Sequence, residues 1–393
     1  MDSSLPVARP RPLNLLTETA PETPMGRLLR TFWHPIAIAD SVANGSARGL
    51  KILGEELTLY RGESGTPHLV GGRCAHRCTL LHTGWVQGEQ IRCMYHGWRY
   101  DATGQCTELP AERLSAIHVK IAGYPLHEYC GLIFAYFGEA PAPEFDLPRK
   151  EALEQPGNRL IIQEMVWDCN WFQQVENSLD AVHVSFVHMW GEVGRFGAEI
   201  STMLPELRYE ETSAGIRQTA TRAKNNVRVS DWTFPNNNHI LAAGLAAGDP
   251  WYHTSVWVVP IDDERTLRFR IAALPASGES VRMLTDDPHR DYNPAHFHEE
   301  LFEHHRVPAS GQTTGLAASQ DYVSVRGQGT IVNRTNERLV SSDAGIALQR
   351  RIAFREMEAL QDGRATKRWH RHNDAVRMSQ PGEETGGFDH QGS

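Results

Sequence analysis

Four residues in the first quarter of the chain have the types and spacing of a metal centre. Cys74 and His76 form a C-x-H pair, and after sixteen further residues Cys93 and His96 form a C-x-x-H pair. Two thiolates and two imidazoles could close a tetrahedral zinc site, but such sites usually take two cysteines from one loop and two histidines from the next. A [2Fe–2S] cluster can instead carry two thiolates on one iron and two imidazoles on the other. The mixed pairs favour the cluster over a zinc knuckle or four unrelated loop residues.

A second set of potential ligands lies at 170–189, where apolar residues recur with helical spacing. Asp180, His183 and His188 read D-x-x-H-x4-H. Asp180 and His183 share a helix face, whereas the two histidines lie about 140° apart on a regular helix. Both can bind one ion only if the helix ends or carries a π-like turn there. The alternative is a pair of ordinary polar positions on an amphipathic helix.

The strand and turn signals around these residues predict a small β domain followed by a larger one. Between 49 and 137 short β-type runs alternate with turn residues, and both ligand pairs fall between them. A short helix is expected from Pro24, ending before Pro35. Several prolines at 138–155 mark a linker, and the runs in the second half predict a strand and then one antiparallel sheet: 161–167, 207–209, 216–222, 227–233, 253–259 and 267–273.

The remaining segments carry weaker signals. Residues 276–318 lack clear periodicity and are expected to form a loop or lid region, and a terminal helix is predicted at 342–360. The polar, Gly-rich stretch at 366–393 predicts a disordered tail.

Composition bounds the partners of the chain. Its 393 residues are enough for two domains, and a net charge of −9 gives no basic face for nucleic acid or an anionic membrane. The N-terminal residues lack the apolar core of a signal peptide, and no window approaches about 18 apolar residues, so a cytoplasmic location is expected. The cysteines outside the two pairs are expected to be reduced thiols: Cys78, Cys106, Cys130 and Cys169.

The two Cys-His loops closely resemble the Rieske domain of Rieske non-haem iron oxygenases, which carry C-x-H-R and C-x-x-H-G-W. The stretch from Gly329 to Leu339, followed by Ser342 to Ile346, resembles the phthalate dioxygenase and aryl O-demethylase branch. The resemblance implies an α+β fold, with an all-β Rieske [2Fe–2S] domain and then a helix-grip (START-like) catalytic domain built on an antiparallel sheet. The implied divisions are an arm and short helix (1–30), the Rieske domain (31–140), the catalytic mononuclear iron domain (141–365) and the tail (366–393).

The resemblance also implies roles for the candidate residues. Cys74 and Cys93 would hold the buried iron of the cluster, and His76 and His96 the outer iron. His183 and His188 would bind a mononuclear Fe(II) together with Asp321, which matches a distal acidic ligand at the start of a helix and leaves positions open for O2. The competing carboxylates lie in stretches that do not resemble the ligand segment: Asp286, Asp287, Glu299, Glu300, Glu303 and Asp343.

Asp180 has two readings. By resemblance it bridges the mononuclear site to a cluster histidine of a neighbouring subunit, in an enzyme that is commonly a homotrimer or a trimer-based oligomer. The alternative is a carboxylate that only orients His183.

The implied reaction uses O2 and two electrons from NAD(P)H, relayed by a separate reductase or ferredoxin, to hydroxylate or O-demethylate an aromatic substrate in aromatic compound catabolism. No G-x-G-x-x-G nucleotide motif opens a helix in this chain, so the reductase is expected to be another protein. A carboxylated substrate would need an arginine that binds it in a bidentate way, and candidates lie on the predicted strands: Arg208, Arg222, Arg228, Arg268 and Arg270. Asn236, Asn237, Asn238 and His239 could also line a pocket. A Rieske electron carrier and a ligand sensor without turnover are the alternative functions.

Overall fold

The computed structural model describes residues 12–112, 118–188, 203–223, 226–242, 251–275 and 316–369, together with Gly278, Val281, Arg282 and Thr285. The predicted lid at 276–318 therefore lies largely outside the described residues, as does the tail beyond 369. None of the helices in the described part of the chain is long and apolar enough to cross a membrane.

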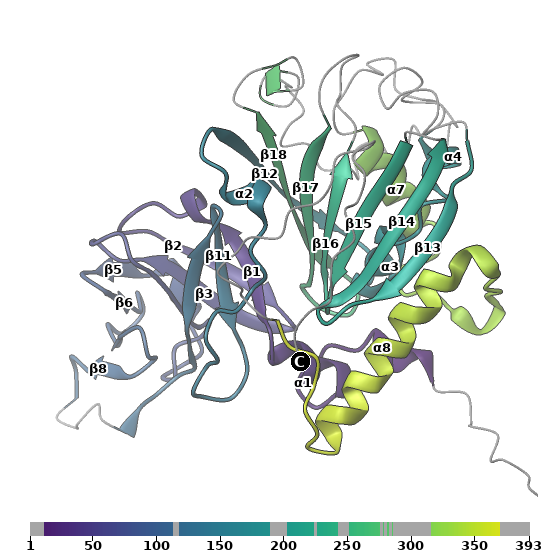
Figure 1. Ribbon diagram of the computed structural model, residues 1–393. Coiled ribbons are helices and arrows are strands. Elements are labelled where there is room, and N and C mark those ends of the chain that lie inside the picture. The colour runs from purple at the N-terminus through teal and green to yellow at the C-terminus, as the bar shows by residue number, and fades with distance from the viewer. Residues whose placement is uncertain are drawn as a thin grey trace, which may run out of the picture.

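The N-terminal part of the chain forms three small antiparallel sheets, as the β-type runs predict. In Figure 1 they lie in purple and blue on one side of the molecule. The first sheet has the order β1-β11-β10, the second β2-β3-β4-β9 and the third β5-β6-β7-β8. The strands are β1 (Trp33–Ile38), β2 (Ala47–Ile52), β3 (Glu55–Arg61), β4 (Pro67–Gly71), β5 (Trp85–Gln87), β6 (Gln90–Arg92), β7 (Arg99–Tyr100), β8 (Cys106–Glu108), β9 (Gly123–Tyr124), β10 (Leu126–Tyr129) and β11 (Leu132–Tyr136).

Helix α1 (Pro24–Arg30) precedes these sheets and begins where the sequence predicts. Thr23 accepts a hydrogen bond from the Gly26 backbone N–H, and Pro24 takes the first helical position, where the missing N–H costs nothing. The sequence predicts a helix that continues to just before Pro35, but α1 ends at Arg30. Pro35 lies inside β1 instead. That strand forms the edge of its sheet and has a register shift after Pro35, and proline is tolerated at such a position.

The second part of the chain forms one seven-stranded antiparallel sheet with the order β12-β18-β17-β16-β15-β14-β13. Helices α3 and α7 lie along it in Figure 1, and α3 contacts β16 and β17. The strands are β12 (Asn158–Trp167), β13 (Glu206–Glu211), β14 (Gly215–Ala223), β15 (Asn226–Thr233), β16 (Asn237–Ala242), β17 (Tyr252–Pro260) and β18 (Thr266–Pro275). The helices are α2 (Glu151–Glu154), α3 (Trp171–Ser178), α4 (Val184–Val187), α7 (Leu316–Arg326) and α8 (Ala344–Gln361).

The sequence pattern missed strand β16. It begins with two asparagines and a histidine, which are depleted in strands. Their side chains find buried partners instead: Asn237 donates to Ser255 Oγ at 2.9 Å, and Asn238 donates to the Ser178 carbonyl at 2.8 Å. The predicted pocket residues of this stretch are therefore fully buried residues of the sheet, and Asn238 ties the sheet to α3.

The single helix predicted at 170–189 is two helices in the structure. The N–H groups of Val182 and His183 both donate to Asp180 Oδ1, at 2.9 and 3.2 Å, so the side chain takes the place of a helical carbonyl and the chain turns. Helix α3 ends at Ser178 and α4 starts at Val184. The expectation that the helix must end near the two histidines is confirmed.

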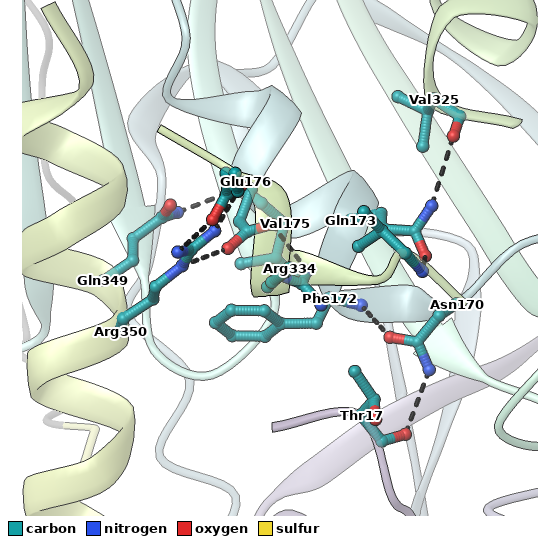
Figure 2. A network of polar contacts seen from close by, with 12 residues as sticks. Thr17, Asn170, Phe172, Gln173, Val175, Glu176, Val325, Arg334, Gln349 and Arg350 are labelled. Carbon is teal, nitrogen blue, oxygen red and sulfur yellow. Dashed lines mark hydrogen bonds and ion pairs between the residues drawn. The ribbon is translucent and has the colours of Figure 1, made fainter. Parts of the chain in front are cut away.

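Buried charges fix α3 against the C-terminal part of the chain. Arg334 and Arg350 each donate to the carboxylate of Glu176 at 2.6 Å (Figure 2). Arg350 also pairs with Glu337. The four side chains carry two positive and two negative charges, so the network is neutral. A buried network of this kind holds its members in one geometry because the loss of one partner leaves a charge unpaired.

Gln173 ties the same helix to the end of α7. Its amide Nε2 donates to the Val325 carbonyl at 3.2 Å (Figure 2). The same nitrogen donates to the Gly329 carbonyl at 3.0 Å, and its Oε1 accepts from the Val332 N–H at 2.9 Å. The carbonyls at a helix C-terminus have no partner within the helix, and Gln173 supplies one. These contacts fix α3, which precedes the two histidines, against the end of α7, which carries Asp321.

The C-terminal segment joins the two parts of the molecule. The indole N–H of Trp369 donates to the Phe234 carbonyl at 2.6 Å, and its ring lies 5.4 Å from the ring of Phe32 and 6.2 Å from that of Trp257. Trp369 is only 2% exposed. A disordered tail starting at 366 is therefore wrong for residues 366–369, because the aromatic side chain buries a large apolar surface.

Candidate functional site

The two Cys-His pairs meet at one end of the N-terminal sheets. Cys74 and Cys93 are buried, whereas His76 and His96 are exposed with ring centroids 4.4 Å apart. The backbone of each loop folds over its cysteine, since the N–H groups of Cys78 and of Gly97 donate to the carbonyls of Cys74 and Cys93 at 3.0 Å. Two buried thiols beside two exposed imidazoles fit a [2Fe–2S] cluster with an outward imidazole edge.

Two aromatic residues orient these side chains. The Ala75 N–H donates to the Tyr100 hydroxyl at 3.0 Å, so the Tyr100 O–H is free to donate to Cys74 Sγ, which lies 3.3 Å away. The His76 ring stacks on Trp98 at 4.6 Å with an interplanar angle of 7°. Hydrogen bonds to a ligand sulfur tune a cluster's potential, and stacking fixes the direction of the imidazole.

The structure brings His183, His188 and Asp321 together, although Asp321 lies more than 130 residues along the chain from His188. One ligand atom of each lies within 4.8 Å of the others. Asp321 Oδ1 is 3.4 Å from Nε2 of both histidines, and it is buried and has no hydrogen-bond partner among the described residues. Two imidazole nitrogens and one carboxylate oxygen that face one another fit a metal ion bound between them.

The local fold explains how the histidines converge. His183 and His188 flank the single turn of α4, so they do not lie on one regular helix. The resemblance implied an acidic ligand at the start of a helix, but Asp321 lies in the middle of α7. Helices α4 and α7 contact each other, and this contact closes the site.

The charges of the site match a cation. Burial opposes the ionised form of Asp321, but His188 and His183 outweigh it and hold the pKa of the carboxyl far below its usual range. Burial likewise opposes the charged form of His183, but Asp180 and Asp321 raise its pKa to about 9. In the absence of a metal, protons on the imidazoles therefore supply the positive charge that the carboxylate attracts.

Two further residues hold the imidazoles. Gln320, which the sequence did not single out, lies with its Oε1 2.9 Å from His188 Nδ1. Asp180 Oδ2 lies 3.7 Å from His183 Nδ1, and its Oδ1 accepts hydrogen bonds from the backbone N–H groups of Val182 and His183 just before α4. The position of Gln320 directly before Asp321 was the only available signal for it.

Five arginines were candidates for substrate binding, and the structure separates them. Arg208 is exposed. Arg222 donates to two backbone carbonyls, and Arg270 donates to side chains of β12 and β17. In the described part of the chain, Arg228 and Arg268 have no hydrogen bond or ion pair, although burial lowers the pKa of each to about 10.

The competing carboxylates are not part of the described site. Asp343 accepts a hydrogen bond from the Val340 N–H at 2.8 Å and lies before α8, in a different region. The others fall outside the described residues: Asp286, Asp287, Glu299, Glu300 and Glu303.

The chain matches two family descriptions. Residues 32–125 match the Rieske [2Fe–2S] domain, and residues 135–373 match the LigXa C-terminal domain like family. The chain is 32% identical to the 5,5'-dehydrodivanillate O-demethylase oxygenase subunit of Sphingobium sp. over 90% of its own length and 81% of the relative. It is 31% identical to the phenoxybenzoate dioxygenase subunit alpha of Ectopseudomonas oleovorans over 88% and 85%.

Solved structures share the fold at lower identity. NdmA of Pseudomonas putida CBB5 with caffeine superposes with a TM-score of 0.67 at 19% identity, covering 86% of this chain and 94% of that one. The oxygenase of carbazole 1,9a-dioxygenase in complex with a ferredoxin gives 0.59 at 18% identity, covering 84% and 92%. From the two family matches and the relatives above 30% identity, the chain belongs to the Rieske non-haem iron oxygenases, as an oxygenase subunit of the phthalate dioxygenase and aryl O-demethylase branch.

Proposed function

We propose that this oxygenase subunit hydroxylates or O-demethylates a carboxylated aromatic substrate at a mononuclear Fe(II) held by His183, His188 and Asp321. The observation that carries the proposal is the position of Asp321 Oδ1, which lies 3.4 Å from the Nε2 atoms of both histidines and has no hydrogen-bond partner among the described residues. When bound there, Fe(II) supplies the activation of O2, because two imidazoles and one carboxylate leave coordination positions open.

The residues of the chain prepare the site. Gln320 Oε1 accepts the Nδ1–H of His188, so in the neutral imidazole the lone pair is on Nε2, which lies 3.4 Å from Asp321 Oδ1. Asp321 is mostly buried, and the two histidines beside it hold the pKa of its carboxyl far below its usual range and keep it ionised. The site therefore presents one negative charge and two neutral nitrogen ligands to a divalent metal at neutral pH, once the imidazole protons have left.

Electrons enter through the cluster loops. We assign Cys74 and Cys93 to the buried iron and His76 and His96 to the exposed iron. Three large apolar residues beside them are about half exposed: Trp85 at 54%, Met94 at 50% and Tyr95 at 54%. Such a surface favours contact with another protein. It suits a reductase or ferredoxin that carries electrons from NAD(P)H, and the ferredoxin complex of carbazole 1,9a-dioxygenase supports this partner.

The same cluster edge supports a homotrimer. Asp180 is partly exposed, so a cluster histidine of a neighbouring subunit could reach it while Asp180 contacts His183. In that arrangement Asp180 bridges the cluster of one subunit and the iron of the next. The cytoplasm, where the reductase and NAD(P)H are present, is the proposed location.

Iron counting tests the two-site assignment. The protein should contain about three irons per chain and show substrate-dependent O2 uptake with a surrogate reductase and a panel of aromatic acids. His183→Ala should keep the visible Rieske spectrum and lose one iron and turnover, because the cluster ligands lie in separate sheets. Loss of the cluster spectrum in a folded His183→Ala protein would contradict the assignment.

Asp321→Ala tests the carboxylate ligand. It should weaken the mononuclear iron and abolish most turnover, because only two neutral imidazoles then remain for a hard cation. Full iron and activity in this variant would place the carboxylate elsewhere. An electron carrier would hold two irons per chain, and a sensor would bind aromatic acids without O2 uptake.

A further inference from the structure

Asp180 lies on the short segment between α3 and α4, and strand β14 holds the peptide carbonyls on both sides of it. The Gln218 amide Nε2 donates to the Leu179 carbonyl, and Arg222 Nη2 donates to the Ala181 carbonyl at 2.9 Å. Leu179 and Ala181 are the two neighbours of Asp180 in the chain. The backbone of Asp180 is therefore fixed to the sheet at two points, one before it and one after it.

Gln218 and Arg222 reach this segment because they share one face of β14. They are four residues apart, and alternate side chains of a strand point to the same side. Both are buried, at 1% and 6% exposure. The pairing of β14 with β15 also shifts register between Thr221 and Ala223, so Arg222 lies at a bulge, a feature that redirects a side chain and is common beside active sites.

The Leu179 carbonyl needs such a donor. Leu179 follows the last residue of α3, and the final carbonyls of a helix find no N–H within that helix. The hydroxyl of Tyr209 also lies 3.3 Å from this carbonyl, and it accepts from Gln218 Nε2 at 3.3 Å. Because a buried carbonyl that loses its donor is costly, we expect the segment to move when Gln218 is removed.

The position of the backbone determines the position of the Asp180 carboxylate. Its Oδ1 accepts from the N–H groups of Val182 and His183 at 2.9 and 3.2 Å, and its Oδ2 lies 3.7 Å from His183 Nδ1. The carboxylate cannot turn without breaking the two backbone hydrogen bonds. The side chain is nevertheless 32% exposed. The two contacts from β14 thus hold in place a carboxylate that contacts His183 and is accessible from the surface.

We propose that Gln218 and Arg222 are positioning residues for electron transfer, which hold Asp180 against His183 at the surface of the subunit. The proposal rests on the proposed function, in which Asp180 connects the cluster of one subunit to the iron site of the next. The reduced cluster is oxidised by one electron, and this electron is consumed in the reduction of O2. Neither positioning residue touches the reacting atoms, so its loss should slow the transfer and leave the ligands in place.

Gln349 provides a matched control on the same helix. Its Nε2 donates to the Val175 carbonyl of α3 at 3.0 Å, and it is fully buried (Figure 2). Val175 lies five residues before Asp180, so the loss of this bond weakens α3 but does not release the peptides beside Asp180. Gln218→Met and Gln349→Met each replace one buried amide by an apolar chain of similar size.

Hydrogen exchange of the holoprotein, followed by mass spectrometry, measures the positioning without turnover. The N–H groups of Val182 and His183 should exchange about fivefold faster in Gln218→Met than in the parent, as expected for the loss of one hydrogen bond. Gln349→Met should protect both groups as the parent does. Equal protection of these groups in the two glutamine variants would overturn the proposal.

Arg222 is tested by a conservative and a disruptive substitution. Arg222→Met should expose the same two N–H groups to exchange, whereas Arg222→Lys should restore part of the protection because it keeps the charge and a donor for the Ala181 carbonyl. Equal exchange in the lysine and methionine variants would remove Arg222 from the assignment.

A single turnover measures the consequence for electron transfer. The pre-reduced protein is mixed with O2 and the aromatic acid that gives the fastest O2 uptake in the panel. Oxidation of the cluster should be slower by about tenfold or more in Gln218→Met and Arg222→Met, with the iron content of the parent, because contacts behind a site commonly contribute this much. Gln349→Met should keep the rate of the parent.

The outcomes separate this proposal from the proposed function. A cluster that is oxidised as fast in Gln218→Met as in Gln349→Met would overturn the positioning role alone. A parent whose cluster is not oxidised with any aromatic acid would contradict the proposed function, and the exchange of the two N–H groups then decides by itself whether β14 holds the Asp180 segment.

Discussion

His188 Nδ1 and Gln320 Oε1 form a hydrogen bond of 2.9 Å, and Gln320 immediately precedes Asp321 on α7. An amide oxygen only accepts, so Nδ1 carries a hydrogen, and in the neutral imidazole the lone pair is therefore on Nε2. Nε2 is the atom that lies 3.4 Å from Asp321 Oδ1. One helix thus supplies both a candidate ligand and the residue that orients another.

Gln320→Met should weaken metal binding without unfolding the protein. Removal of the acceptor frees the imidazole to rotate or change tautomer, and losses of this kind cost about 10–100-fold in metal affinity. Titration of the metal-depleted protein with Co(II), followed by its visible absorbance, measures the affinity directly. Ser324→Ala is the matched control, because Ser324 binds only the Gln320 backbone carbonyl on the same helix. Equal Co(II) affinity in the two variants would exclude the orienting role.

The sequence predicted which candidate ligands come together better than it predicted the elements that hold them. The spacing of the Cys-His loops and of Asp180, His183 and His188 carries the chemistry, and the structure brings His183 and His188 together with Asp321. The sequence indicates that the helix must be interrupted if both histidines bind one ion, but it does not show how. In the structure the side chain of Asp180 accepts two backbone N–H groups at the break between α3 and α4. Local periodicity cannot report such a contact.

Long-range partners explain the other differences. Strand β16 was missed because its asparagines find partners on β17 and α3, and the partners of a polar residue are invisible in the sequence. Trp369 lies in a polar stretch that predicts disorder, yet its ring packs between segments far away in the chain. Whether an arginine finds a hydrogen-bond partner likewise depends on the fold. Among the described residues Arg270 donates to two side chains, whereas Arg228 and Arg268 have no hydrogen-bond partner.

His34 should make stability depend on pH. Burial lowers its pKa to about 4, and it is fixed as a neutral ring because the Asn236 amide donates to Nδ1 while Nε2 lies 2.8 Å from the Leu29 carbonyl. The unfolded chain, with an ordinary pKa near 6.5, binds more protons than the folded chain between these values. The neutral His34 therefore costs no stability above about pH 6.5, and the free energy of unfolding falls as the pH falls from there towards about 4.

Urea unfolding at two pH values measures this contribution. From about pH 7 to about pH 5 the parent should lose about 2 kcal/mol more than His34→Gln, because glutamine can make both hydrogen bonds but does not titrate. The same pH dependence in both proteins would show that His34 is not responsible.

Trp369→Ala should destabilise the protein by about 3 kcal/mol or more, the usual cost of removing a buried large aromatic side chain. The substitution also leaves the Phe234 carbonyl without its donor. Trp85→Ala is the matched control, since that residue is 54% exposed and should change the free energy of unfolding little. Similar unfolding midpoints for the two variants would mean that the C-terminal segment does not hold the two parts of the molecule together.

Asp180→Asn should slow electron transfer while leaving both metals in place. Asparagine keeps the oxygen that caps α4 through the N–H groups of Val182 and His183, but it removes the charge that faces His183 Nδ1. In a single turnover of the pre-reduced protein with substrate and O2, oxidation of the cluster should slow by at least about tenfold, equivalent to about 1.4 kcal/mol of coupling.

Two measurements on the same samples make the Asp180 result decisive. Iron content must equal that of the parent, which separates a lost bridge from a lost ligand geometry at His183. Asp343→Asn is the matched control, because Asp343 also accepts a backbone N–H but is not part of the His183, His188 and Asp321 group, and the variant should leave the rate unchanged. If Asp180→Asn holds its full iron and its cluster is oxidised as fast as in the parent, Asp180 only orients His183, and another group must carry electrons between subunits.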